Sequence, residues 1–164
     1  MSAGNISEFI GSFATTELAR PSRFEVLISG APKEFVFRCE SAELPGKTFM
    51  THDQKIYGPT QKFPYQHQYN DINLTFIVSD NMGEKVFFDR WMNDISSIES
   101  YDFNYKKDYA KEVYIHQYRL NDKKSLSIRL DQAYPIGINQ LDLDWSSDGH
   151  HKLVVTLAYN YWEY

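Results

Sequence analysis

The chain has 164 residues, 42% of them hydrophobic and 24% charged, which is the composition of an ordinary globular protein. Its 17 basic and 22 acidic residues leave a net charge of −5, which argues against a protein that holds nucleic acid through Lys and Arg. The aromatic fraction of 16%, with 12 Tyr and 11 Phe, is high. It favours surface that becomes buried on association, although β-rich proteins also prefer Tyr.

The length predicts one domain over residues 1–164. The single cysteine, Cys39, cannot form an internal disulfide, and its apolar strand position predicts a buried thiol. No basic region followed by an apolar run opens the sequence, and no stretch reaches the roughly 20 apolar residues that span a bilayer. We therefore expect folding in a reducing cytoplasm.

The first 70 residues predict two strands and a long irregular segment. Residues 1–20 carry at most a short helical pattern and are expected to form an N-terminal arm. Alternating apolar residues predict strands at 24–28 and 35–39, joined as a hairpin by a turn at 30–33. Residues 44–70 hold three Pro, two Gly and a polar run, which predicts a long loop that is functional or orders on binding.

The middle of the chain predicts one strand and one helix. Residues 72–78 alternate as a strand, and 82–98 show helical spacing. Asp80 or Asn81 is the expected cap, and Glu84 lies in the first turn, where the helix dipole favours a negative charge. The helix is expected to pack on a sheet through a buried stripe with these members: Val86, Phe87, Arg90, Trp91, Asp94, Ile95 and Ile98, widened by Phe88 and Met92.

The remaining pattern is again that of strands. Residues 112–120 and 125–132 predict a hairpin with a tight turn, 133–139 predict a loop, and 140–145 with 153–164 predict a second hairpin. Both faces of the last strand are partly apolar, so we expect it to be held by other strands rather than frayed. Seven or eight strands and one helix predict a mainly β fold, an antiparallel sandwich or barrel with a flanking helix.

No pattern in the sequence predicts an enzyme, a cofactor or a metal site. His150 and His151 are adjacent, point apart on a hairpin and have no third ligand at a recognisable spacing. Asp142 and Asp144 share a strand face, as paired catalytic carboxylates would, but a solvated acidic face is the simpler interpretation. Phosphate-binding loops, nucleophile elbows and HExxH motifs are absent from the sequence.

Four stretches of the chain resemble the tail tube proteins of contractile-tailed bacteriophages, the myoviruses. The first two are ARPSRFEVLIS (19–29) and FVFRCESAELPG (35–46), with its Leu-Pro turn. The third is VFFDRW (86–91), which is similar to the family's helix. The fourth is the closing block from Tyr134 to Tyr164, including its near-terminal Tyr-Trp-Glu. Their order and spacing, more than any one stretch, carry the resemblance.

The resemblance implies a β-sandwich subunit that forms hexameric rings, which stack into a hollow tube whose strands join in one ring-wide barrel. It implies as partners further copies of the chain, the tail sheath protein, a baseplate tube initiator, the tape-measure protein and a tail terminator. DNA would pass through the lumen into the host without specific binding. The protein would be part of the virion, assembled in the host cytoplasm.

The same resemblance suggests roles for particular residues. We expect ring stacking to use the irregular segment and the N-terminal arm, with these contacts: Leu44, Pro45, Gly46, Tyr57, Gly58, Pro59 and Phe63. Subunit contacts at a sheet edge are expected at Leu157, Tyr159, Tyr161 and Trp162. Asp142 and Asp144 are candidates for an acidic lumen lining that would repel phosphates.

Three other functions remain open on the sequence. The protein could be a baseplate tube initiator or the tube of a related contractile injection system. It could instead be a monomeric β-barrel that binds a small ligand in an aromatic-lined cavity. A hydrolase using the His and Asp residues at 144–151 is the third alternative.

Overall fold

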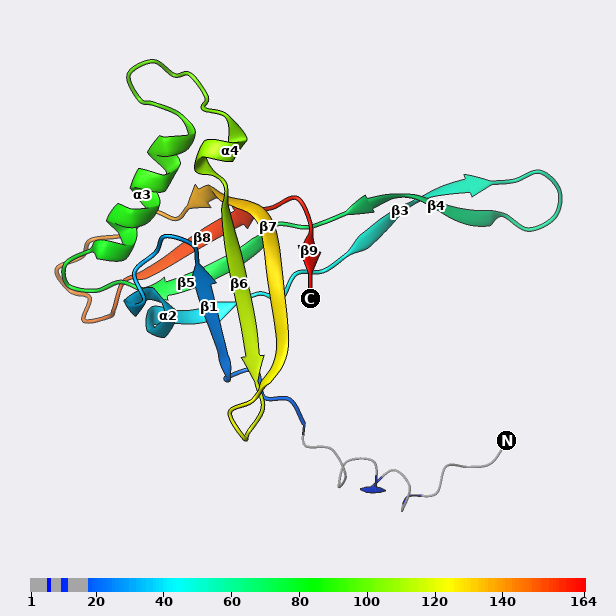
Figure 1. Ribbon diagram of the computed structural model, residues 1–164, viewed down its shortest axis with the longest axis horizontal. Coiled ribbons are helices and arrows are strands. Elements are labelled where there is room, and N and C mark those ends of the chain that lie inside the picture. The colour runs from blue at the N-terminus through cyan, green and yellow to red at the C-terminus, as the bar shows by residue number, and fades with distance from the viewer. Residues whose placement is uncertain (1–5, 7–9, 12–17) are drawn as a thin grey trace.

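The computed structural model describes residue 6, residues 10–11 and residues 18–164, so the expected arm of residues 1–20 lies almost entirely outside the described residues. Figure 1 shows curved strands with helix α3 beside them and a long hairpin that extends away from the body. The described elements from residue 24 onward are β1 (Phe24–Ile28), α2 (Glu34–Arg38), β2 (Cys39–Ala42), β3 (Thr48–Gln54), β4 (Gln61–Gln68), β5 (Ile72–Ile77), α3 (Gly83–Ile95), α4 (Lys106–Tyr109), β6 (Lys111–Tyr118), β7 (Lys124–Ile138), β8 (Lys152–Ala158) and β9 (Trp162–Glu163).

Seven strands form one antiparallel sheet that bends at β7. The order is β1-β6-β7-β8-β5-β2, and β9 also pairs with β7. The first part of β7 pairs with β6 as far as Ala133, and the last part, from Tyr134, pairs with β8. Gln132, with a φ of 48°, marks the change of partner. The two halves of the sheet therefore face each other, and the predicted antiparallel, mainly β fold is confirmed.

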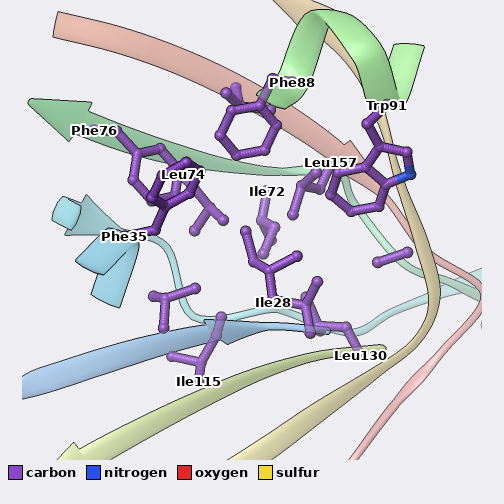
Figure 2. Packing of buried hydrophobic residues seen from close by; sticks show 14 of the residues in the cluster. Ile28, Phe35, Ile72, Leu74, Phe76, Phe88, Trp91, Ile115, Leu130 and Leu157 are labelled. Atoms are coloured by element: carbon purple, nitrogen blue, oxygen red, sulfur yellow. The ribbon is translucent and has the colours of Figure 1, made fainter. Parts of the chain in front are cut away.

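The core lies between these two halves and is covered by α3. Alternate residues of each strand point inward, as expected from the period of two in a strand. Figure 2 shows Phe88 and Trp91 of α3 directed toward the side chains of the sheet. The indole Nε1 of Trp91 donates a hydrogen bond to the carbonyl of Tyr109 at 2.7 Å, which joins α3 to α4. The apolar strand residues with 0% exposure are Leu74, Phe76, Val113, Leu130, Ala133, Leu153, Val155 and Leu157.

The prediction of a strand at residues 35–39 is wrong. Residues 34–38 form the short helix α2, and β2 begins at Cys39 and pairs with β5 rather than with β1. Only Phe35 of this segment packs into the core, while Phe37 is 88% exposed. An apolar alternation over only five residues is too short to distinguish a short helix from a strand.

The prediction of a long loop at 44–70 is also wrong. Residues 48–54 and 61–68 form the strands β3 and β4, which pair as a two-stranded antiparallel sheet separate from the main one. Every residue of both strands is exposed. The apolar alternation that marks a strand is missing because neither face of this hairpin packs on the core.

Two further corrections concern the chain after residue 132. The predicted loop at 133–139 continues β7 to Ile138, even though it contains Pro135 and Gly137. Pro is tolerated because this part of β7 pairs only with β8 and so forms a sheet edge. The predicted strand at 140–145 is absent, and β8 pairs with β5 and β7 instead of forming a terminal hairpin.

Helix α3 is shorter than expected and presents a different face. It ends at Ile95, and its buried residues are Glu84, Phe88 and Trp91. Val86 and Ile98, two members of the predicted stripe, are 42% and 68% exposed. The N-cap position is occupied by Met82 rather than by Asp80 or Asn81. Asn81 nevertheless accepts a hydrogen bond from the N–H of Gly83, the first residue of the helix, at 3.1 Å.

The predicted burial of Cys39 is confirmed in part. The residue is half-buried, and this burial raises the pKa of its thiol to about 12. Among the described residues, the helices are too short or too polar for any of them to cross a bilayer.

Candidate interaction surfaces

The β3–β4 hairpin carries a large share of the exposed apolar side chains of the described chain. Six large apolar side chains lie on it, and each is at least 42% exposed: Phe49, Met50, Ile56, Tyr57, Phe63 and Tyr65. A hairpin of two strands is at best marginally stable in water unless it packs on something else. No other part of the described chain covers these strands. The hairpin is therefore suited to packing against another chain.

Both faces of the hairpin carry apolar groups. The Tyr65 hydroxyl lies 3.8 Å from the sulfur of Met50, and Phe63 pairs across the strands with His52 on the same face as Met50. On the opposite face the rings of Phe49 and His67 lie 5.0 Å apart between centroids and are tilted by 53°. A register shift between Met50 and Thr51 separates the Phe49–His67 pair from the His52–Phe63 pair along the hairpin. A partner could thus contact either face.

The residues predicted for ring stacking lie at the tip of this hairpin, at its base and on β4. Tyr57, which is 99% exposed, Gly58 and Pro59 form the turn at its tip, where the φ of 87° at Gly58 suits glycine. Leu44 and Gly46 are exposed at its base, while Pro45 is buried. Phe63 lies on β4 between these ends. The exposed Phe49, Met50 and Tyr65 were not singled out from the sequence, although its high aromatic content was a signal for Phe49 and Tyr65.

The predicted edge residues divide into two groups. Leu157 is fully buried on β8, which is paired on both sides, so its placement at a sheet edge is corrected. Trp162 belongs to β9, which pairs with Leu130 and Arg129 of β7 and ends the sheet on that side. Tyr159 and Tyr161 lie in the short connection before β9 and are partly exposed.

An ion-pair network holds this terminal strand. Arg129 donates to Glu163 at 2.9 Å through Nε and to Glu112 of β6 at 2.8 Å through a terminal nitrogen. The hydrogen bond to Glu163 contributes most to raising the pKa of Arg129. The hydroxyl of Tyr114 also donates to Glu112, at 2.6 Å. The last strand is thus tied to its own sheet, as the sequence predicted.

Asp142 and Asp144 lie on the coil between β7 and β8, not on a strand, and both are exposed. Asp144 accepts hydrogen bonds from the N–H and the hydroxyl of Ser146 at 3.0 and 2.9 Å, and these bonds lower its pKa. Leu143 and Trp145, which alternate with these two aspartates in the sequence, are also exposed, at 88% and 107%. This coil is therefore a mixed acidic and apolar surface.

The most buried charge belongs to Glu84 at the start of α3. Arg38 of α2 pairs with its Oε1, while the N–H and hydroxyl of Ser79 donate to its Oε2 at 2.9 and 2.7 Å. Burial alone raises the pKa of Glu84, but these hydrogen bonds outweigh it and lower the pKa to about 2. Fully bonded in this way, the carboxylate has a structural role. The described residues contain no group of three or more His, Cys, Asp or Glu placed to bind a metal ion.

Comparison with known proteins decides the family. The sequence pattern of the family described as "Phage tail tube protein" matches residues 10–164. The chain belongs to this family. Its sequence is 25% identical to the tail tube protein gp19 of Enterobacteria phage T4. It is 24% identical to the tail tube protein gp19 of Enterobacteria phage T6. Each alignment covers 96% of this chain and 99% of the relative.

Solved structures share the fold of this family member. One is a chain of the sheath–tube complex of the extracellular contractile injection system PVC, with a TM-score of 0.69 over 93% of this chain and 95% of that one. Another comes from the six-fold symmetrised baseplate of the anti-feeding prophage, with a TM-score of 0.69 over 90% of this chain and 95% of that one. Both are 18% identical, so they support the fold alone. Family membership makes the chain a structural component of a contractile phage tail.

Proposed function

We propose that this chain forms hexameric rings that stack into the inner tube of a contractile tail, and that DNA is delivered to the host through its lumen. The observation that carries this proposal is the β3–β4 hairpin, which is exposed on both faces and rich in apolar side chains. A hairpin of this kind gains stability only against another chain. Repeated copies supply that chain in a self-assembling tube.

The partners follow from the same assembly. Relatives with this fold occur in a sheath–tube complex, a baseplate and a tube-terminating cap, which supports sheath, initiator and terminator proteins as neighbours of this tube. The six-fold symmetry of the baseplate structure supports a ring of six. A tape-measure protein would occupy the lumen before DNA does. We further propose that strands of neighbouring subunits join around that lumen, because a closed barrel removes exposed strand edges.

Negative-stain electron microscopy of the purified chain across a concentration series tests the proposal. We expect hollow tubes or stacked rings of uniform width. In the variant Ile56→Ser/Tyr57→Ser, which changes only the hairpin tip, tubes should be lost while the melting temperature stays the same, because both side chains are solvent-exposed. A tip variant that still forms normal tubes would count against the hairpin as the contact.

A matched control is available on the other side of the molecule. Ile98 and Tyr101 lie between α3 and α4 and are 68% and 79% exposed, close to the exposure of the tip residues. The variant Ile98→Ser/Tyr101→Ser removes the same side chains and should retain tubes. Equal loss in both variants would show that apolar surface in general, rather than the hairpin, drives assembly.

A baseplate tube initiator is the second candidate, because the same fold occurs in baseplate and cap structures as well as in a tube. An initiator should form one ring and stop. A concentration series that ends in single rings, with no growth on added baseplates, would favour the initiator over the tube.

A further inference from the structure

The two legs of the β3–β4 hairpin are both hydrogen-bonded to the C-terminal segment, residues 159–163. On the incoming leg, the indole Nε1 of Trp162 donates to the carbonyl of Gly46 at 3.2 Å, two residues before β3 begins. On the outgoing leg, the hydroxyl of Tyr159 donates to the carbonyl of Asn70 at 2.8 Å, two residues after β4 ends. The segment therefore contacts the hairpin at the two points where it leaves the body.

Aromatic and cationic contacts reinforce the same junction. The rings of Tyr69 and Tyr159 lie 6.2 Å apart between centroids. The ammonium group of Lys47 lies 5.9 Å from the ring of Tyr69 and 5.4 Å from that of Phe49. A contact between a cation and an aromatic face is attractive, so Lys47 and Tyr69, the residues just before β3 and just after β4, are drawn together across the base of the hairpin.

The C-terminal segment is itself fixed to the body. Tyr159 and Trp162 are partly buried against the hydrophobic core. The backbone N–H of Asp131 donates to the carbonyl of Tyr161 at 3.0 Å, and that of Asn160 donates to the carbonyl of Asp131 at 3.0 Å. Glu163 is held by Arg129. The segment thus joins the rigid sheet to a hairpin that has no core of its own.

We propose that Tyr159 and Trp162 are positioning residues, which fix the direction of the β3–β4 hairpin before a second copy of the chain binds it. This inference deepens the proposed function and rests on it for the role of the hairpin. A hairpin held in one direction loses less conformational freedom on docking than one that pivots freely at its base. The C-terminal segment would thereby control how readily subunits assemble.

Hydrogen exchange of the unassembled chain tests the positioning role directly. The variant Tyr159→Phe/Trp162→Phe removes both donors while leaving an aromatic ring at each position. Amides at 46–50 and 66–71 should exchange roughly fivefold faster or more for each lost hydrogen bond, given the usual strength of such a bond. Amides of β5 and β8 should be unchanged, which would show that the body remains folded.

The matched control is Tyr161→Phe/Trp145→Phe. It makes the same two chemical changes, at side chains for which the described structure shows no hydrogen bond: Tyr161 is 40% exposed and Trp145 fully so. We expect the control to exchange like the wild type. Unchanged exchange at the hairpin base in the Tyr159/Trp162 variant would overturn the inference.

Tube yield in the same samples tests the consequence for assembly. The Tyr159/Trp162 variant should need a higher protein concentration than the wild type and the control to form tubes. A loosened hairpin base together with an unchanged assembly threshold would overturn the positioning role. If the wild type forms no tubes at all, the proposed function fails, and the exchange comparison still decides whether these two residues fix the hairpin.

Discussion

Glu84 is the residue at which charge and folding are most closely linked. Its side chain is fully buried, and Arg38 and Ser79 supply its hydrogen-bond partners from outside the helix to which it belongs. Arg38 thus joins α3 to α2, and Ser79 joins it to the segment that follows β5. A buried carboxylate with bonds to both oxygens can remain ionised where an unpaired one would not.

This arrangement predicts an acid-sensitive fold. The pKa of Glu84 is about 2 in the folded chain, against an ordinary value of 4.5, so the unfolded chain binds the proton more readily. The stabilisation from Glu84 is complete above about pH 4.5 and is lost as the pH falls toward 2. Urea unfolding midpoints measured between pH 7 and pH 3 should fall along this range. Glu84→Gln should be less stable at pH 7 and should depend less on pH below 4.5; parallel curves would contradict the assignment.

Among the elements, the β3–β4 hairpin differs most from the rest of the sheet. Its amides should exchange with solvent much faster than those of β5, β6 and β8 in the unassembled chain, because no buried side chain holds its strands together. On assembly the same amides should become protected. Hydrogen exchange compared below and above the tube-forming concentration measures both. Strong protection of the hairpin in the free chain would show that it is stable alone.

The sequence predicted most of the strands that pack on the core and missed β3 and β4, which do not. The strands at 24–28, 72–77 and 152–158 alternate apolar and polar residues because one face of each is buried. The strands at 48–54 and 61–68 lack that signal because all of their residues are exposed and neither face packs on the core. Pro135 made the last part of β7 resemble a loop, and only the strand pairing shows that this part is a sheet edge, where Pro is tolerated.

The candidate surface was predictable only in part. The turn at Tyr57, Gly58 and Pro59 stands out in the sequence because Gly and Pro interrupt regular structure. Nothing in the sequence places Trp162 against Gly46, because this contact joins residues 116 positions apart. Leu157 looked like part of a terminal edge for the same reason, since strand order is a property of the whole sheet.

Deletion of the terminal strand tests its role in stability and in assembly. Deleting residues 159–164 removes β9, the partner of Arg129 and two side chains packed against the core. We expect a folded chain that is less stable by about 2–4 kcal/mol, given typical values for partly and fully buried side chains, and that forms no tubes. Circular dichroism during heating and electron microscopy measure the two effects. Deleting Tyr164 alone should have little effect on either, and tubes from the longer deletion would refute this role.

For the whole molecule, the acidic balance matters most at the proposed lumen. A tube that conducts DNA must not hold it, and a negatively charged wall lowers the local affinity for phosphates. Asp142 and Asp144 lie on an exposed coil after β7, where neither carboxylate is paired with a basic side chain within the described structure. Asp94 and Asp102 are likewise exposed, but lie at the end of α3 and in the loop after it.

These two pairs make the lumen assignment testable at constant net charge. Asp142→Lys/Asp144→Lys and Asp94→Lys/Asp102→Lys each change the net charge from −5 by +4 to −1. If Asp142 and Asp144 line the lumen, tubes of the first variant should retain DNA at low salt. They should release it as the salt concentration rises, because cations from the solution then replace the lysines at the DNA phosphates. Phage carrying that variant should eject DNA more slowly, while the α3 variant should match the wild type. Equal DNA retention by both variants would place Asp142 and Asp144 elsewhere on the tube.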